Sequence, residues 1–116
     1  MAYTYAFAAP ITSGQTDACR RFIAELSGPR QAEFADMQRR SGVTEETYWL
    51  QESPDGDLMI VVSDSDQRAF NELMVNPQTD FDRWFREQVQ PILGGDPAAF
   101  GDVPPPPTPL LEWRAS

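Results

Sequence analysis

The sequence of 116 residues has no histidine and no lysine, and its one cysteine is Cys19. Without histidine, the chain lacks the commonest general base, the commonest metal ligand and the central member of a Ser/His/Asp relay. A single cysteine cannot form a disulfide within the chain, and the start has no basic leader, so we expect a cytoplasmic location. No apolar run approaches the roughly 18 residues that a membrane span requires, and a membrane is not an expected partner.

Positive charge is also scarce. The chain has 18 acidic residues against 9 basic ones, all arginine, which gives a formal net charge of -9 and a pI near 4.2. A field of this sign repels phosphate backbones and anionic lipids, so nucleic acid is not an expected partner either. Hydrophobic residues make up 41% of the chain. This is enough for one packed interior, and we expect a soluble protein with a single domain over residues 1–116.

The first part of the chain shows a strand followed by an interrupted helix. Bulky and small side chains alternate over residues 3–8, the period-2 pattern of a strand. A helical pattern follows, with Thr12 or Ser13 as the expected N-cap. Because Gly28 and Pro29 interrupt that pattern, it predicts one long kinked helix or two stacked helices.

The strongest local signal is a β-hairpin. Two strand-like runs, over residues 46–52 and 58–63, flank Pro54 and Gly56. Proline presets a turn φ and glycine tolerates a positive φ, so these residues favour a tight turn between two paired strands.

A second pair of helical segments follows the hairpin. Ser65 is the expected N-cap of the first, and after Pro77 the helical spacing of apolar residues resumes at Thr79. Asp82 and Arg86 stand four residues apart and are expected to form an ion pair on the exposed side of this helix.

The end of the chain is rich in proline and glycine. Residues 94–109 form a spacer that contains four consecutive prolines, a composition typical of a stiff polyproline II arm. Residues 110–114 (LLEWR) are predicted to form a last short strand. We expect the arm to position this strand along a sheet edge, which can be an edge of the partner subunit. The alternative is that the proline run is a ligand for a proline-binding domain.

The order of elements predicts an α+β, ferredoxin-like β-α-β-β-α-β fold. It has a four-stranded antiparallel sheet with two long kinked helices on one face. Two helices on one face leave the other face of the sheet uncovered. An exposed aromatic sheet is unfavourable in a monomer, so we expect a homodimer that packs through the open face.

Short sequence patterns accompany this order. YWLQ occupies residues 48–51 and PDGD residues 54–57, followed by NP at 76–77 and FDRWF at 81–85. With the element order, these patterns resemble the dimeric α/β-barrel superfamily, and within it a family of small bacterial proteins of unknown function. The superfamily includes antibiotic-biosynthesis and haem-degrading monooxygenases. The resemblance implies a ferredoxin-like barrel dimer and brings no particular activity with it.

Aromatic and polar side chains suggest a ligand pocket. The residues expected to line it are Tyr5, Arg40, Trp49, Gln51, Trp84 and Arg114. Pockets of this size class are mostly apolar with a few polar groups that orient the ligand, so the expected ligand is a small apolar or aromatic molecule. The alternative is that the aromatic residues only form the core and the dimer interface.

Three functions remain open from the sequence. The first is a small-molecule-binding homodimer without catalysis. The second is a cofactor-independent monooxygenase, cyclase or isomerase in which Tyr5, Trp49, Gln51 and Arg114 position a phenolic or polyketide-like substrate. The third is a structural or interaction protein without a ligand. No catalytic residue, metal ligand or cofactor is assigned, because no glycine-rich nucleotide loop or metal-ligand spacing is present.

Ordinary structural roles are expected for the remaining candidates. Free cysteine is commonly buried, so Cys19 is predicted to be structural. The carboxylate pairs Asp55 with Asp57 and Asp64 with Asp66 are predicted to form turns and N-caps, since neither stretch has the register of a calcium loop.

Overall fold

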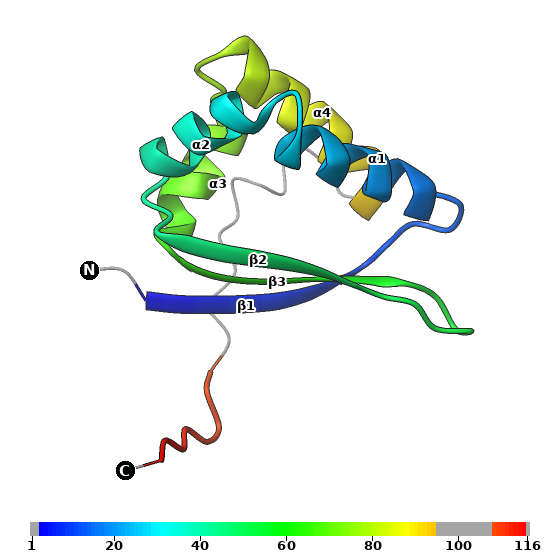
Figure 1. Cartoon of the computed structure of the whole chain (residues 1–116), viewed down its shortest axis with the longest axis vertical. Coiled ribbons are helices and arrows are strands. Elements are labelled where there is room, and N and C mark those ends of the chain that lie inside the picture. Colours follow the sequence, from blue (N-terminus) through cyan, green and yellow to red (C-terminus); the bar gives the residue numbers. More distant parts are fainter. Residues whose placement is uncertain (1–2, 95–107, 116) are drawn as a thin grey trace.

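Four helices lie over one face of a three-stranded antiparallel sheet in the computed structural model, which describes residues 3–94 and 108–115 (Figure 1). The elements are β1 (Tyr3–Pro10), α1 (Thr16–Ser27), α2 (Gln31–Arg40), β2 (Glu45–Gln51), β3 (Leu58–Ser65), α3 (Gln67–Val75) and α4 (Asp80–Leu93). The α+β class is therefore as predicted. Within the described residues, no helix is both long enough and apolar enough to cross a membrane.

β3 is the central strand, because the order in the sheet is β1-β3-β2 and both pairings are antiparallel. The predicted hairpin is confirmed as β2 and β3, with Leu50 opposite Met59. Its turn contains Gly56 at a φ of 129°, where a side chain would be strained. The Asp57 carboxylate accepts a hydrogen bond from the backbone N–H of Ser53 at 3.2 Å, which is the predicted role in the turn.

The predicted interruption at Gly28 separates α1 from α2. A Cβ atom at this position would lie only 2.9 Å from the carbonyl oxygen of Ala24, so the close approach requires glycine. The start of α1 differs from the prediction, since its N-cap position is Gln15 and neither Thr12 nor Ser13 caps it. The reason is an additional turn before the helix, in which the N–H of Gln15 donates to the carbonyl of Thr12 at 2.9 Å.

The N-termini of α3 and α4 are both capped by side chains. Asp66 caps α3, because its carboxylate accepts from two backbone N–H groups of the first turn at 3.0 and 3.2 Å. Ser65, the predicted cap, is still paired in β3. The helix predicted to resume at Thr79 is α4. Thr79 is its N-cap, and Asp82 completes a capping box with it.

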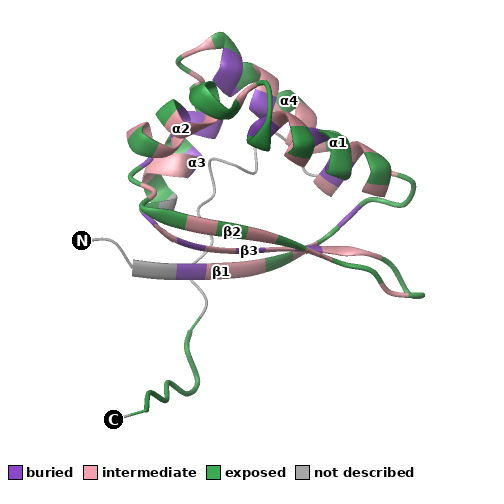
Figure 2. Cartoon of the chain, viewed as in Figure 1, coloured by how far each residue is buried: buried purple, intermediate pink, exposed green. Residues whose placement is uncertain are grey.

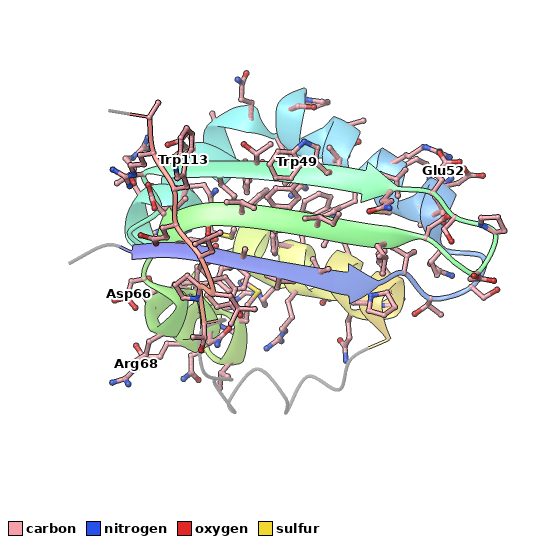
Figure 3. All side chains as sticks on the ribbon, turned by 90° about the horizontal axis from the view of Figure 1, so that it is seen from below. Trp49, Glu52, Asp66, Arg68 and Trp113 are labelled. Atoms are coloured by element: carbon pink, nitrogen blue, oxygen red, sulfur yellow. The ribbon has the colours of Figure 1, made fainter. Side chains whose placement is uncertain are left out.

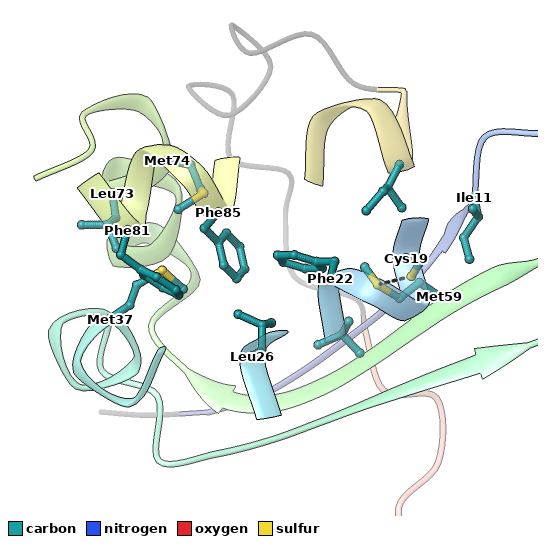
Figure 4. Close-up of a cluster of buried hydrophobic side chains, with 12 residues drawn as sticks. Ile11, Cys19, Phe22, Leu26, Met37, Met59, Leu73, Met74, Phe81 and Phe85 are labelled. Carbon is teal, nitrogen blue, oxygen red and sulfur yellow. Dashed lines mark hydrogen bonds between the residues drawn. The ribbon is translucent and has the colours of Figure 1, made fainter. Parts of the chain in front are cut away.

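The core lies between the sheet and the helices and is built around aromatic rings. The ring of Phe22 in α1 lies 5.1 Å from that of Phe85 in α4, edge-on. Three further rings lie 6.2 Å from Phe85, those of Phe34, Phe70 and Phe81. The buried hydrophobic side chains of this cluster are Ile11, Cys19, Phe22, Leu26, Met37, Met59, Val61, Leu73, Met74, Phe81, Phe85 and Ile92 (Figure 4).

The fourth strand predicted over residues 110–114 is not formed in the structure. Residues 108–115 have no regular secondary structure, and all of them are exposed. This C-terminal segment runs away from the sheet on the side opposite the helices (Figures 1 and 2). The described sheet therefore has three strands, with β1 and β2 at its edges. The proline run of the predicted spacer lies in residues 95–107, outside the described residues.

Candidate functional site

The two faces of the sheet carry different side chains, and the strand register assigns each residue to one of them. The covered face, which meets the helices, carries Tyr5, Phe7, Ala9, Glu46, Tyr48, Leu50, Met59, Val61, Ser63 and Ser65. The open face carries Ala6, Ala8, Pro10, Glu45, Thr47, Trp49, Gln51, Leu58, Ile60, Val62 and Asp64. Each face has a feature that suggests a function, a polar row on the covered face and an apolar centre on the open face.

One row of residues on the covered face is polar. Ser63 in β3 lies between Tyr5 of β1 and Glu46 of β2 in the register of the sheet. The hydroxyl of Ser63 shares a hydrogen bond of 2.9 Å with that of Ser65, and both serines are buried. Polar groups from all three strands therefore gather at one level beneath the helices.

Glu46 connects this polar row to a helix. The side-chain amide of Gln38 in α2 donates to Oε1 of Glu46 at 2.8 Å. The Tyr48 hydroxyl, two residues along the same face of β2, lies within hydrogen-bonding reach of the same carboxylate. Glu46, Tyr48 and Gln38 are all half-buried, because β2 is an edge strand and the helices cover it only in part. We call these three residues the Glu46 cluster.

The surroundings of the Glu46 cluster change its acid–base properties. Burial raises the pKa of the Glu46 carboxyl above its ordinary value, and the hydrogen bonds from Gln38 and Tyr48 offset only part of this effect. Burial raises the pKa of the Tyr48 hydroxyl as well, and the nearby Glu46 carboxylate raises it further. The cluster therefore combines a carboxyl with increased proton affinity, a neutral phenol and an amide. Such a set can accept and donate hydrogen bonds or move a proton.

Of the six residues predicted to line one pocket, Tyr5 lies in the polar row of the covered face. Trp49 and Gln51 point to the opposite, open face, and the side chain of Trp49 is 50% exposed (Figure 3). Arg114 lies in the exposed C-terminal segment. The structure therefore does not bring these four residues together in one pocket of the chain.

Arg40, the fifth residue, forms a buried ion pair. Its guanidinium binds both carboxylate oxygens of Asp82 at 2.8 Å, and it donates to Asp36 at 2.8 Å as well. Burial raises the pKa of Asp82, but hydrogen bonds from Arg40 and from the backbone of Gln78 outweigh it, so this pKa is lowered. The ion pair joins the end of α2 to the start of α4, which is a structural role.

The prediction of an exposed ion pair between Asp82 and Arg86 is wrong, because Asp82 binds Arg40 instead. The Asp82 side chain is fully buried against Arg40. Arg86 instead donates to the carbonyl oxygen of Met74 at 3.0 Å and so satisfies the C-terminal end of α3.

Trp84, the sixth residue, lines a groove on the outer side of the helices. The guanidinium of Arg30 lies 4.2 Å from the centroid of the Trp84 ring, a cation–π contact. The groove has a volume of about 400 Å³ and is lined by Ala18, Arg21, Phe22, Glu25, Arg30, Trp84 and Gln88. These residues belong to α1, to the connection after it and to α4, and none belongs to the sheet, so Trp84 shares no site with the residues of either sheet face.

Cys19 is buried, as predicted. Its thiol lies 3.9 Å from the sulfur of Met59 in the core (Figure 4). Burial raises the pKa of the Cys19 thiol, although the nearby Arg20 lowers it in part. The thiol is therefore not activated as a nucleophile. Among the described residues, no three acidic or cysteine side chains are grouped so that they could hold a metal ion.

The sequence interpretation missed the Glu46 cluster, although a signal for it was present. A strand that places Tyr48 and Leu50 toward the helices must also place Glu46 there, because side chains alternate with a period of two.

Comparisons with protein-family models, with curated proteins and with solved structures found no match. The geometry of the chain itself must therefore carry any functional proposal.

Proposed function

We propose that the protein is a homodimer that binds a small, mostly apolar molecule by hydrogen bonds to Glu46 and Tyr48. This proposal rests on the Glu46 cluster, in which the Glu46 carboxylate on the covered face of the sheet accepts a hydrogen bond from the side-chain amide of Gln38. Removing part of a carboxylate from water costs stability unless its oxygens are hydrogen-bonded. A group of this kind at a partly exposed position is more readily explained by a ligand than by packing.

The neighbourhood of the cluster defines the class of ligand. Leu50 lies next along the same face of β2, and the ring of Phe34 in α2 packs against the core. Both side chains are only partly buried. Apolar walls with a few convergent polar groups are typical of small-molecule sites. A phenol or an aliphatic alcohol fits this environment, because its hydroxyl can donate to Glu46 while its carbon skeleton contacts the apolar side chains.

The open face supports the homodimer. Its centre is apolar, with Ile60 and Val62 on β3 flanked by Ala6, Ala8 and Trp49 on the edge strands. The aliphatic pair is only half-buried in the single chain, and Trp49 is 50% exposed. A contiguous apolar surface of this kind is unusual on a monomer and typical of an interface. A second copy packed sheet to sheet would cover it.

Native mass spectrometry of the protein purified from its own host tests the ligand directly. A retained molecule of phenolic or aliphatic-alcohol type is expected. Each candidate compound is then added in a thermal-shift assay, where saturating ligand should raise the melting temperature. The variants Glu46→Gln and Tyr48→Phe should reduce this shift, whereas Glu45→Gln on the open face should not. If all three variants respond to the compound like the parent protein, the assigned site is wrong.

Sedimentation velocity tests the homodimer. The parent protein is expected to sediment as a dimer, and Trp49→Ser should shift it toward the monomer. Trp84→Ser, which alters the outer groove between α1 and α4, serves as the matched control and should stay dimeric. A parent protein that is monomeric at every concentration contradicts the proposed assembly.

A cofactor-independent enzyme is the second candidate, and it is favoured by one observation. Burial raises the pKa of Glu46, which brings the carboxylate closer to the range of an efficient general base. In this case Glu46 would take a proton from the bound hydroxyl or from a carbon next to a carbonyl group. Turnover of the identified ligand that follows the ionisation of Glu46 and is lost in Glu46→Gln would support this candidate. Binding without turnover would leave the protein as a binding protein.

A further inference from the structure

We infer that the C-terminal segment, residues 108–115, pairs as an added strand with the outer edge of β1 of a second copy of the chain. The inference rests on the proposed homodimer and goes beyond it, because it assigns a place to the segment that the single chain leaves exposed. Three observations carry it: the exposure of the segment, the side of the sheet on which it lies, and the character of the two sheet edges.

The segment presents large apolar side chains to solvent. Leu110 is 97% exposed, Leu111 85% and Trp113 80%. A Leu-Leu-Glu-Trp sequence in water is unfavourable, since burial of each large apolar side chain is worth roughly 1.5–3 kcal/mol. No described part of the same chain covers these side chains.

The position of the segment indicates where that surface lies. Figure 1 shows that the segment runs away from the sheet on the side opposite the helices, and in the view of Figure 3 Trp113 and Trp49 are both seen from this side. A second sheet packed against the open face occupies the same side. The segment of one copy then projects toward the other copy and away from its own helices.

The length of the connection permits this exchange. Residues 95–107 join the end of α4 to the segment. Thirteen residues span at most about 45 Å when fully extended. The segment already lies on the open side of its own sheet, so an edge of a second sheet packed roughly 10 Å away is within its reach.

The two edges of the sheet differ in charge, and the difference selects β1. The edge strand β2 carries Glu45 and Glu46, and such charges protect an edge from added strands. They would also repel Glu112 of the incoming segment. The β1 strand has no charged residue over its whole length, Tyr3–Pro10. The segment is therefore expected to add to β1.

The side-chain pattern of the segment suits this edge. In an added strand Leu111 and Trp113 share one face, because side chains alternate. On the open face β1 presents only Ala6 and Ala8 in its central part, and these small side chains leave room for the larger ones beside them. Leu111 and Trp113 would thus extend the apolar open face by one more strand.

Disulfide trapping between two different chains tests the pairing. One full-length chain carries Ala8→Cys and a purification tag, and the co-expressed second chain carries Leu111→Cys without a tag. Neighbouring strands bring Cα atoms to about 4.5–5.5 Å, which is within the range of a disulfide. Because the register is not fixed, Ala6→Cys is tested in parallel. Cys19 is buried and stays in both chains. A pair of chains without the introduced cysteines shows how much linkage Cys19 gives by itself.

The expected result is a disulfide-linked product that contains one chain of each kind. The matched control places the first cysteine at Thr47, on the open face of the other edge strand, β2, and should give no linked product. Equal trapping at Thr47 would overturn the choice of β1. A single chain with both Ala8→Cys and Leu111→Cys that closes on itself would show that the segment pairs within its own chain, which also overturns the inference.

The state of assembly separates this inference from the proposed function. Removal of residues 108–116 is expected to raise the dissociation constant of the dimer by at least about tenfold, because the burial of Leu111 and Trp113 is lost. A dimer of unchanged affinity that gives no trapped product overturns the exchange and leaves the sheet-to-sheet dimer in place. A parent protein that is monomeric overturns both.

Discussion

The two faces of the same sheet differ in burial, although both carry apolar side chains at the centre. In β3, the covered-face residues Met59 and Val61 are 6% and 3% exposed, whereas Ile60 and Val62 between them remain half-buried on the open face. Yet the first five residues of the strand, 58–62, are apolar on both faces. An antiparallel strand with one face in water normally alternates between apolar and polar residues, and a continuous apolar run is typical of a strand buried on both faces. This part of β3 is therefore consistent with the proposed homodimer, in which a second copy would cover the open face.

Two residues of the edge strand β2 depart from the usual arrangement of apolar residues toward the core and polar residues toward water. Its charged Glu46 points to the covered face and its apolar Trp49 points to the open face. Packing of a monomer would favour the reverse. The positions of Glu46 on the covered face and Trp49 on the open face are consistent with a polar site under the helices and an interface on the other side. Function, more than the stability of the single chain, would then explain both positions.

The largest expected effect on the covered side follows from the ion pair between Arg40 and Asp82. Arg40→Ala leaves a fully buried carboxylate without its cation, and we expect a loss of about 3–5 kcal/mol in the free energy of unfolding. Urea denaturation measures this loss. Arg39→Ala removes the neighbouring, largely exposed arginine and is the control, with a change within about 0.5 kcal/mol. Equal effects of the two variants would show that the buried pair is not important for packing the helices.

A smaller effect compares the two faces at adjacent valines. Val61→Ala creates a cavity in the core and is expected to lower the free energy of unfolding by about 2 kcal/mol at any protein concentration. Val62→Ala should cost less in the monomer. Its effect should grow at concentrations where the dimer forms, because the open face is then buried. Denaturation at several protein concentrations distinguishes the two. If the effect of Val62→Ala does not depend on concentration, the open face is not the interface.

Local sequence signals predicted much of the fold, since they depend on neighbouring residues. The hairpin, the break at Gly28 and the helix that resumes at Thr79 are present as expected. The caps of α1 and α3 were misplaced by one to three residues, because an extra turn and the full length of β3 displace them. The strand predicted over residues 110–114 has a strand-like sequence, but a strand forms only where an edge is available to pair with it.

The candidate site was predicted less well, because it depends on which face of each strand meets the helices. Trp49 and Tyr5 were assigned to one pocket, but the register places them on opposite faces. Arg40 was assigned to a ligand, but it binds Asp82, which is 42 residues away in the sequence. Pairings between distant residues are set by tertiary structure, and no local pattern contains them. The arginine at position 40 suggested a polar group in a pocket, whereas its ion pair with Asp82 gives it a structural role.

The smallest expected effect concerns the pH dependence of stability, and two carboxylates on the covered side contribute with opposite signs. Burial raises the pKa of Glu46 above 4.5, so the folded protein binds this proton more tightly than the unfolded chain does. The contribution of Glu46 to stability is fully present below pH 4.5 and is lost as the pH rises through the folded pKa. The pKa of Asp82 is lowered from 3.8, so its contribution is present above that pH and is lost in more acidic solution.

Glu46→Gln keeps an oxygen that can accept from Gln38 but removes the titration. We therefore expect the variant to lose the decline in stability that the parent protein shows above pH 4.5, with a difference in slope of at most about 1.4 kcal/mol per pH unit, the limit for one proton. Urea denaturation across the acidic to neutral range measures it. Glu45→Gln, the neighbouring carboxylate on the open face, should follow the parent protein. Parallel curves for the parent protein and Glu46→Gln would show that Glu46 has the same proton affinity in the folded and unfolded chain. The covered face of the sheet would then hold no carboxylate with a raised pKa, and the proposed site at Glu46 would lose its support.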